Sequence, residues 1–300
     1  MSSPQAQCRT RLSARFSADL MLLAAAAIWG AGFVPGRLAS DHLGPLFYNG
    51  TRFLTGMVFL LIVAGKRLRG LTRREIWAGV AGGVVMALAA NPQQMGLHFT
   101  TAGKAGFITG LYVVMVPLFA AIVRWKLPHW SVWAASLLAT VALFLLSGLQ
   151  RLALAQGDAW VLVGAVFWAV HIVLVSKLLP RADALRFSLV QYAVCGVLST
   201  SLGLLFEPQS IPGLSQAWWA VLYNGVMSVG VAFTLQILGQ RHAPPADAAV
   251  LLSSESVFAA LFGWLFLHEL LTSLQLFGCG LLLAAMLLAQ SKSLRAGADG

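Results

Sequence analysis

Long apolar runs, repeated along the whole chain, constrain this sequence more than any other feature. Ten such runs, each bounded by charged or turn residues, have about the 20 residues that an α-helix needs to cross roughly 30 Å of hydrocarbon. Only 10% of the residues are charged, against roughly 25% in soluble globular proteins, which excludes a water-soluble fold. The predicted spans are residues 18–38, 45–65, 75–98, 103–123, 130–148, 158–179, 184–206, 216–240, 245–267 and 272–290.

Lysine and arginine residues gather on alternate predicted loops. Only Arg37, Lys104 and Arg151 fall on the side opposite to the others, and Arg52 lies deep within a span. Because positive loops stay in the cytoplasm, this pattern predicts a multi-pass protein of the cytoplasmic (inner) membrane with both termini cytoplasmic. The net charge of +10 is then explained by the orientation of the protein in the bilayer and by attraction to lipid headgroups. Nucleic acid is not an expected partner.

Weak internal similarity relates the two halves of the chain. Because each half has five spans, an odd number, the second half must enter the membrane in the opposite direction, and such inverted repeats are typical of alternating-access transporters. A shift of 143 residues aligns Gln93, Gly96, Ala105, Val114, Leu118 and Phe119 with Gln236, Gly239, Ala248, Val257, Leu261 and Phe262.

The spans and the repeat together predict the organisation of the chain. The fold class is all-α, with ten transmembrane helices arranged as two inverted five-helix repeats around a central cavity. The predicted parts are a cytoplasmic N-terminal segment (1–17), a first repeat (18–148), a connecting loop (149–157), a second repeat (158–290) and a cytoplasmic tail (291–300).

Two charged side chains lie deep inside predicted spans, where each costs about 2.5–3.5 kcal/mol on insertion scales and therefore indicates function. Arg52 is seven residues into the second span, and Glu255 is near the middle of the ninth. Glu255 is a candidate proton-coupling or substrate-amine group, and Arg52 is its partner or a clamp for a carboxylate. The alternatives are a structural ion pair, or a snorkelling arginine and a carboxyl kept neutral by burial.

A polar cluster surrounds a proline in the third span. Because proline removes a backbone donor, and irregular backbone at this depth needs protein or a wet cavity around it, we expect polar side chains here to face a cavity. Gln93 and its repeat partner Gln236 are predicted to share that cavity; interhelical hydrogen bonds are the alternative. The cluster comprises Asn91, Pro92, Gln93, Gln94 and His98.

Three ring-bearing residues in the spans have two interpretations each. His171 is a proton shuttle or, as we favour for a lone histidine among apolar residues, a packing residue. Trp29 and Trp168 occupy similar places in spans 1 and 6, where they form a stacking wall for an amphipathic ligand or anchor the interface. Spans 5 and 10 contain no charged residue, so we assign them to scaffolding or to homodimer contact.

The motifs of enzymes and ATPases are absent from the sequence. There is no H-E-x-x-H, no G-x-S-x-G and no Walker glycine loop. The three cysteines have no metal-binding spacing. We therefore expect no enzyme and no cofactor or metal, and any active transport of the solute draws on an ion gradient, with protons as the candidate ion.

Two stretches carry a resemblance to a known family. The first comprises QMGLHFTTAGKAGFI (94–108), LYVV (111–114) and VPL (116–118), and the second is SSESVFAA (253–260), followed by Leu267, His268 and Glu269. They resemble the EamA branch of the drug/metabolite transporter superfamily, as two tandem repeats over nearly the whole chain. The resemblance implies ten helices in a basket around a central cavity, and transport, often efflux, of amino acids, other metabolites or drugs. It also adds Tyr112 to the candidate cavity residues.

The chain departs from that family pattern at two places. Ser256 stands where the family commonly has proline, and His268 stands where it has glycine. The resemblance therefore does not predict a helix break caused by proline at position 256. Glu269 is expected to contact a helix end or a loop.

These features together predict a secondary transporter that exports a small metabolite, such as an amino acid, or a drug. A passive facilitator or channel and a non-transporting membrane scaffold are the alternatives. A lipid-processing enzyme is disfavoured because it needs a cluster of acids or histidines at one interface, and the sequence shows none.

Overall fold

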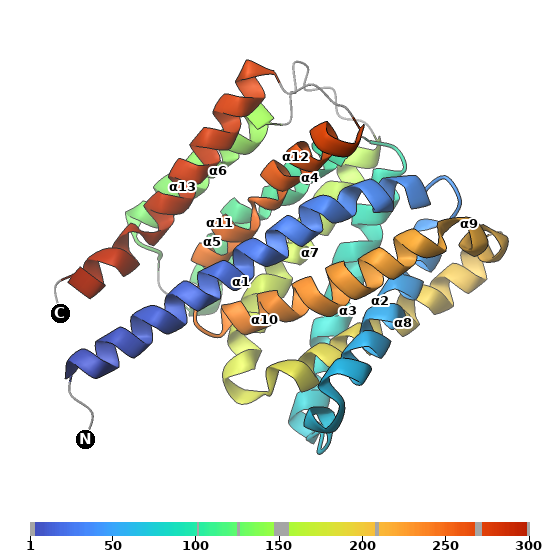
Figure 1. Cartoon of the computed structure of the whole chain (residues 1–300), viewed down its shortest axis with the longest axis horizontal. Helices are drawn as coiled ribbons and strands as arrows, with labels where there is room; N and C mark the ends of the chain where they lie inside the picture. Colours follow the sequence, from blue (N-terminus) through green and yellow to red (C-terminus); the bar gives the residue numbers. More distant parts are fainter. Residues whose placement is uncertain are drawn as a thin grey trace.

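A computed structural model describes residues 4–100, 102–124, 127–146, 156–207, 210–267 and 272–298. These residues form helices joined by short connections, with no strand among them (Figure 1). Residues 149–155 of the predicted connecting loop, and Glu269, lie outside the described part. In chain order the elements are α1 (Pro4–Ala39), α2 (Pro45–Ala64), η1 (Gly65–Leu68), α3 (Arg73–Leu97), α4 (Ala102–Gly110), α5 (Tyr112–Arg124), α6 (Trp130–Leu146), α7 (Gln156–Leu178), η2 (Leu179–Arg181), α8 (Ala184–Phe206), α9 (Ser210–Tyr223), the π-helix η3 (Asn224–Phe233), α10 (Thr234–Gln240), α11 (Pro245–Leu252), α12 (Glu255–Leu267) and α13 (Ser273–Ala298).

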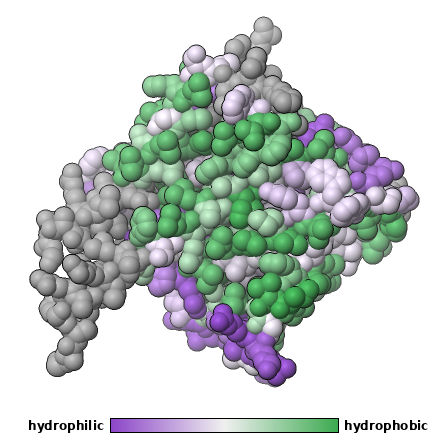
Figure 2. Space-filling model, viewed as in Figure 1, coloured by the Kyte–Doolittle hydropathy of each residue, from purple (hydrophilic) through white to green (hydrophobic). Residues whose placement is uncertain are grey.

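Within the described ranges, seven helical segments are long and apolar enough to cross a membrane, and α6 and α13 contain shorter apolar helices. α3 is 25 residues long but is interspersed with glycine and amide side chains, which lower its mean hydropathy. Hydrophobic residues cover the middle of the face in Figure 2, and hydrophilic residues gather at its lower and right-hand edges. The structure therefore supports a multi-pass membrane protein, while the count of ten spans and the cytoplasmic termini stay predictions.

Local sequence signals set where several helices begin. Thr72 and Glu75 form a capping box, in which the Thr72 hydroxyl accepts from the Glu75 amide and the Glu75 carboxylate accepts from the Thr72 amide. α2 begins with Pro45, and its first free amides donate to a carboxylate from the end of α8, with Phe47 N 2.9 Å from Glu207 Oε2. The local sequence thus sets where α2 begins, and a tertiary contact satisfies its free amide groups.

Three predicted spans are not single α-helices. The fourth divides into α4 and α5, the ninth divides into α11 and α12, and the eighth runs from α9 through η3 into α10. Under the 143-residue shift that relates the halves, Leu111 corresponds to Ser254, so the interruptions of the fourth and ninth spans fall at equivalent positions. Discontinuous helices in corresponding places of two repeats are typical of transporter binding sites.

Pro117 leaves one backbone acceptor free within α5, the second half of the fourth span. Proline has no N–H, so the carbonyl of Val113, four residues earlier, has no helical partner. The Ser136 hydroxyl of α6 donates to this carbonyl at 3.1 Å. A side chain from a neighbouring helix therefore satisfies the polar group that the proline leaves free.

Serine side chains take the corresponding role in the ninth span. The hydroxyls of Ser253 and Ser254 each donate to the carbonyl three residues earlier, at 2.7 and 2.6 Å. The Ser256 hydroxyl donates to the Gly106 carbonyl at 3.1 Å and links α12 to α4. The helix is thus interrupted although position 256 is serine, because serine hydroxyls compete for the backbone acceptors.

The two halves of the chain interleave. α3 packs against α7 and α8, α2 packs against α8 and η3, and α1 packs against α12, η3 and α10. Glycines allow the close approach: Gly50 of α2 faces the backbone of Thr200 in α8, and Gly203 of α8 faces Phe47. α6 and α13 pair with each other at one edge (Figure 1). Their assignment to a homodimer contact stays a prediction.

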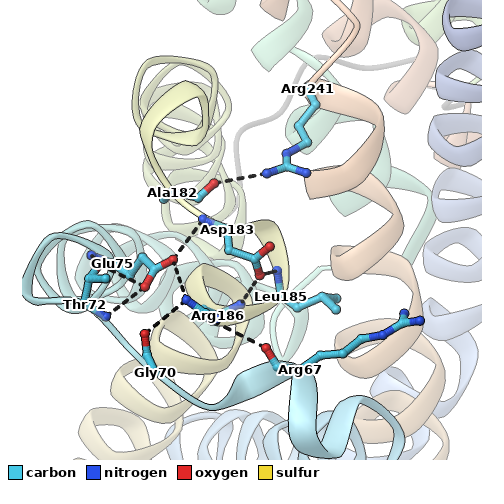
Figure 3. Close-up of polar contacts among 9 residues, drawn as sticks. All are labelled: Arg67, Gly70, Thr72, Glu75, Ala182, Asp183, Leu185, Arg186 and Arg241. Carbon is cyan, nitrogen blue, oxygen red and sulfur yellow. Dashed lines mark hydrogen bonds and ion pairs between the residues drawn. The ribbon is translucent and has the colours of Figure 1, made fainter.

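Polar contacts tie three connections together at the end of the bundle where the basic loops lie (Figure 3). The Asp183 amide donates to Glu75 Oε1 at 3.2 Å, and Arg186 Nη1 lies 3.5 Å from the same oxygen. Arg241 donates to the Ala182 carbonyl at 3.2 Å. These contacts join the α2–α3, α7–α8 and α10–α11 connections, so this end, called the basic end below, is cross-linked.

Candidate functional site

A cavity lies between the two halves of the chain. The space within its lining is about 770 Å³, including space open to solvent. Helices of both halves contribute to it, but α6 and α13 do not. The lining residues are Trp29, Gly32, Phe33, Gly36, Tyr48, Arg52, Gln93, Gln94, Leu97, Ala105, Thr109, Tyr112, Trp168, Ile172, Asn224, Ser228, Phe233, Gln236, Leu252 and Glu255.

The cavity extends along the bundle and stops short of the basic end. It reaches Leu97, the last residue of α3, on the side away from the basic end. Toward the basic end it reaches Gln236 and Ile172. There Gln240 accepts from Gln236 Nε2 at 3.0 Å and donates to the Ile172 carbonyl and to the Ser176 hydroxyl, at 3.0 and 3.3 Å. A hydrogen-bonded layer of buried side chains thus lies between Gln236 and the basic end.

Most of the residues that the sequence singled out line this cavity. Gln93 and its repeat partner Gln236 both belong to the lining, from α3 and α10. Three candidates lie outside it: Asn91, His98 and His171. The candidates in the lining are Trp29, Arg52, Gln93, Gln94, Tyr112, Trp168, Gln236 and Glu255. Their roles in binding stay predictions.

Arg52 extends from α2 into the cavity. Its guanidinium lies over two aromatic rings, 5.6 Å from the centroid of Tyr48 and 5.0 Å from that of Phe53. Such cation–π contacts stabilise a partly desolvated charge. Among the described residues, no Asp or Glu side chain lies within ion-pair distance of Arg52. The structural ion pair with Glu255, which the sequence left open, is therefore not formed.

A chain of amide and hydroxyl groups holds Arg52 from behind. Arg52 Nε donates to Asn49 Oδ1 at 2.8 Å. Asn49 Nδ2 in turn donates to the Ala90 carbonyl at 2.8 Å and to Asn91 Oδ1 at 3.0 Å. The Ser199 hydroxyl of α8 donates to the same Asn91 oxygen at 3.0 Å. Asn91, predicted as a cavity residue, is instead buried behind Arg52, where it fixes the Asn49 amide.

Glu255 and Tyr112 each follow the interruption of a span. They are related by the 143-residue shift, and each begins the second half-helix of its span. The Tyr112 hydroxyl lies close to the Glu255 carboxyl, but neither its oxygen nor Glu255 Oε1 has a partner with hydrogen-bond geometry among the described residues. A buried carboxyl without a cation is costly when ionised, so this site favours a proton or a cationic group of a ligand.

Aromatic rings form one wall of the cavity. Phe233 stacks on Trp168, with centroids 5.5 Å apart, and contacts Trp29 at 4.6 Å. Trp168 Nε1 donates to Gln93 Oε1 at 3.1 Å, and Gln93 Nε2 donates to the Thr109 hydroxyl at 2.9 Å. The indole N–H and the Gln93 amide are therefore hydrogen-bonded to each other, and the rings of Trp29, Trp168 and Phe233 belong to the cavity lining.

The two histidine candidates lie outside the lining. His171 is fully buried, and its Nε2 shares a hydrogen bond of 3.0 Å with Gln191 Oε1. Its ring packs edge-on against Trp168, 5.8 Å between centroids. The assignment of His171 to packing instead of proton transfer stays a prediction. His98 is half-buried at the C-terminal end of α3.

Several lining residues were not singled out from the sequence. Asn224 Nδ2 donates to the Gly32 carbonyl at 3.1 Å and also to the Tyr48 hydroxyl, which joins η3, α1 and α2. The Ser228 carbonyl accepts from Trp29 Nε1 at 3.2 Å. An amide side chain within an apolar run is the signal that singled out the glutamines, and it also marks Asn224. Asn224 begins a π-helix, an element frequent at functional sites.

The chemistry of the cavity is that of binding. Among the described residues, no three His, Cys, Asp or Glu side chains are grouped closely enough to hold a metal ion. The lining instead offers one guanidinium, one carboxyl, several amides and an aromatic wall, which together suit a small amphipathic solute.

The comparison with protein families decides what kind of protein carries this cavity. A family model described as "EamA-like transporter family" matches residues 16–148 and again residues 155–290. The chain belongs to this family. The two matches of the EamA-like model show that it consists of two tandem repeats, and the equivalent interruptions at Leu111 and Ser254 lie one in each repeat.

Relatives of this EamA-like protein extend over nearly its whole length. A protein of Archaeoglobus fulgidus named "Uncharacterized transporter" is 31% identical and aligns over 91% of this chain and 86% of its own. The "Uncharacterized transporter YoaV" of Bacillus subtilis is 23% identical over 84% of this chain and 89% of its own. A protein of known crystal structure shares the fold, with a TM-score of 0.77 at 20% identity over 93% of this chain and 98% of its own.

Proposed function

We propose that this EamA-like protein is a secondary transporter that exports a small metabolite, an amino acid or a similar solute, or a drug, across the cytoplasmic membrane by alternating access. The observation that carries the proposal is the position of the cavity. It lies where the interrupted helices of both repeats meet, with Tyr112 on one and Glu255 on the other. Irregular helix segments within a membrane are tolerated where they line a cavity, and they supply transporter sites.

The basic loops support an orientation. With them in the cytoplasm, the cavity extends toward the opposite side of the membrane and the cytoplasmic end is closed. At that end Arg15 of α1 bridges two carboxylates, with Nη2 2.8 Å from Asp247 Oδ2 and Nε 3.1 Å from Asp19 Oδ1. The Gln240 layer lies nearer the cavity. We infer that the structure is the state closed to the cytoplasm, and that these contacts open in the other state.

Glu255 is the proposed coupling group. It is 5% exposed, lines the cavity and has one oxygen without a partner. Proton binding from one side and release to the other would couple solute movement to a proton gradient. Protons are therefore the proposed coupling ion, and the family resemblance supports efflux as the direction.

The test uses the purified protein in proteoliposomes. Uptake and counterflow of labelled amino acids, nucleosides and cationic drugs are measured with and without a proton gradient. Wild type is compared with Glu255→Gln, and Asp41→Asn is the matched control because Asp41 is an exposed carboxylate outside the cavity. We expect saturable flux that counterflow stimulates, and gradient-driven flux that Glu255→Gln loses and Asp41→Asn keeps.

The other outcomes separate the rival functions. Flux that counterflow does not stimulate would indicate a passive channel instead of a carrier. Absence of flux for every compound would favour a scaffold. Gradient-driven flux that persists in Glu255→Gln would remove Glu255 from the coupling role and leave the carrier function standing. Uptake into inside-out membrane vesicles, driven by an interior-acid gradient, tests export.

A further inference from the structure

We propose that Arg52 is the carboxylate-binding residue of this cavity, held in a binding-ready orientation by Asn49, and that the solute is a zwitterionic amino acid with an apolar or aromatic side chain. The inference rests on the proposed transport function and names its substrate class. It follows from two opposite charges that line one cavity and are not paired with each other.

The guanidinium has unused donors. Of its five N–H groups, the one on Nε donates to Asn49 Oδ1, and no described residue accepts from the four on the two Nη atoms. A guanidinium stays protonated in proteins, so it cannot become neutral when it lacks an anion. Its fork matches the two oxygens of a carboxylate in a bidentate contact. An anionic group of the solute is the partner that this site lacks.

Asn49 acts as a positioning residue. Its Nδ2 donates to the Ala90 carbonyl and to Asn91 Oδ1, so its Oδ1 must point toward Arg52. Asn49 and Asn91 are buried, and Ser199 secures Asn91 from α8. The network therefore fixes Nε and leaves the Nη edge of the guanidinium free for the cavity.

The charges of the cavity select a monocarboxylate over a phosphate. Arg52 is the one Lys or Arg among the described lining residues, and Glu255 lies in the same lining. A phosphate dianion would have too little positive charge and would be repelled by an ionised Glu255. A zwitterion places a carboxylate on Arg52 and an ammonium near Glu255, and its apolar part contacts the wall of Trp29, Trp168 and Phe233.

Two measurements on the purified full-length protein test the proposal. The first is competition for counterflow of labelled L-phenylalanine by L-phenylalaninamide, 3-phenylpropionate and phenyl phosphate. The second is the thermal stability of the protein in detergent with each compound, because a ligand that binds the folded state raises the melting temperature whether or not it is transported. We expect L-phenylalanine to compete and to raise the melting temperature at the lowest concentration, followed by 3-phenylpropionate. L-phenylalaninamide and phenyl phosphate should have the weakest effect.

Variants assign the effect to Arg52. Loss of a charge-assisted bidentate contact should raise the half-saturating concentration of L-phenylalanine roughly tenfold to a hundredfold in Arg52→Gln, and Arg52→Lys should recover only part of it. Asn49→Ala should raise the half-saturating concentration of the amino acid and leave that of the amide unchanged. Arg37→Gln is the matched control because Arg37 lies outside the lining and is partly exposed.

The outcomes separate this inference from the transport function. Flux of L-phenylalanine that Arg52→Gln leaves unchanged, or equal action of the amide and the amino acid, overturns the carboxylate site and leaves the transporter standing. A stability shift that needs the carboxylate and Arg52, without flux, upholds the site and overturns transport. If no carboxylate changes the stability of a folded wild type, the inference is wrong.

Discussion

The contact between α2 and α8 makes Gly50 a position where adding one methyl group should be costly. An ideal Cβ on Gly50 would lie 2.3 Å from the backbone N of Thr200 and 2.6 Å from its Cα, whereas ordinary contacts are 3.4–4 Å. Backbone atoms cannot rotate away, so the two helices must separate by about 1 Å, and neighbouring side chains lose part of their dispersion attraction. Overpacking of this kind costs about 1–3 kcal/mol.

Gly280→Ala is the matched control for Gly50→Ala. Gly280 also lies within a helix, α13, but an ideal Cβ at this position would meet no atom of the described residues within 4 Å. Both changes gain the same helix propensity, so the difference in their free energies of unfolding isolates the packing cost. We expect Gly50→Ala to be less stable than Gly280→Ala by about 1–3 kcal/mol.

Reversible unfolding in mixed detergent micelles, followed by circular dichroism, measures this difference. Because Gly50 is two residues before Arg52, Gly50→Ala should also raise the half-saturating solute concentration in counterflow, whereas Gly280→Ala should not. Equal stability of the two variants would show that α2 and α8 are not packed as closely as the structure indicates.

Three further experiments test other parts of the fold. Arg15→Gln and Asp247→Asn should show a coupling energy of about 0.5–3 kcal/mol in a double-mutant cycle of unfolding, and additive effects would contradict the ion pair. Ser136→Ala removes the donor to the Val113 carbonyl. It should lower the free energy of unfolding by about 1 kcal/mol or less and speed hydrogen exchange in the fourth span around Val113. Unchanged exchange would refute this role. Thr72→Ala removes the N-cap of α3 and should lower the free energy of unfolding by about 1 kcal/mol. Thr72→Ser keeps a capping hydroxyl and should retain most of the wild-type stability.

Local sequence signals were enough to predict the helices and the most unusual side chains. Apolar runs predict helices because a backbone in hydrocarbon must satisfy its own hydrogen bonds. Arg52 and Glu255 stood out because a charge inside such a run is costly, and both line the cavity. The repeat relation of Gln93 and Gln236 also pointed to residues that share the cavity lining.

Other features of the site depend on distances between residues that are far apart in the sequence, and no local sequence pattern specifies these distances. His98 and Asn91 belong to the same polar cluster as Gln93, yet their directions on α3 place them outside the lining. Asn49 was not singled out, although it holds both Arg52 and Asn91. The role of a polar side chain on a helix depends on the residue that it contacts. That residue belongs to a distant part of the sequence, so a local pattern does not identify it.

The sequence by itself determined that this protein is helical, lies in a membrane and carries a related pair of halves, because hydropathy, charge and repetition are properties of the chain alone. Only the tertiary structure decided that Arg52 and Glu255 do not pair. Close packing of the interleaved helices sets the positions of their backbones, and the distance between two charges on different helices follows from that packing. The same packing supplied Ser136 to the carbonyl of Val113 and brought the two interrupted spans together around one cavity.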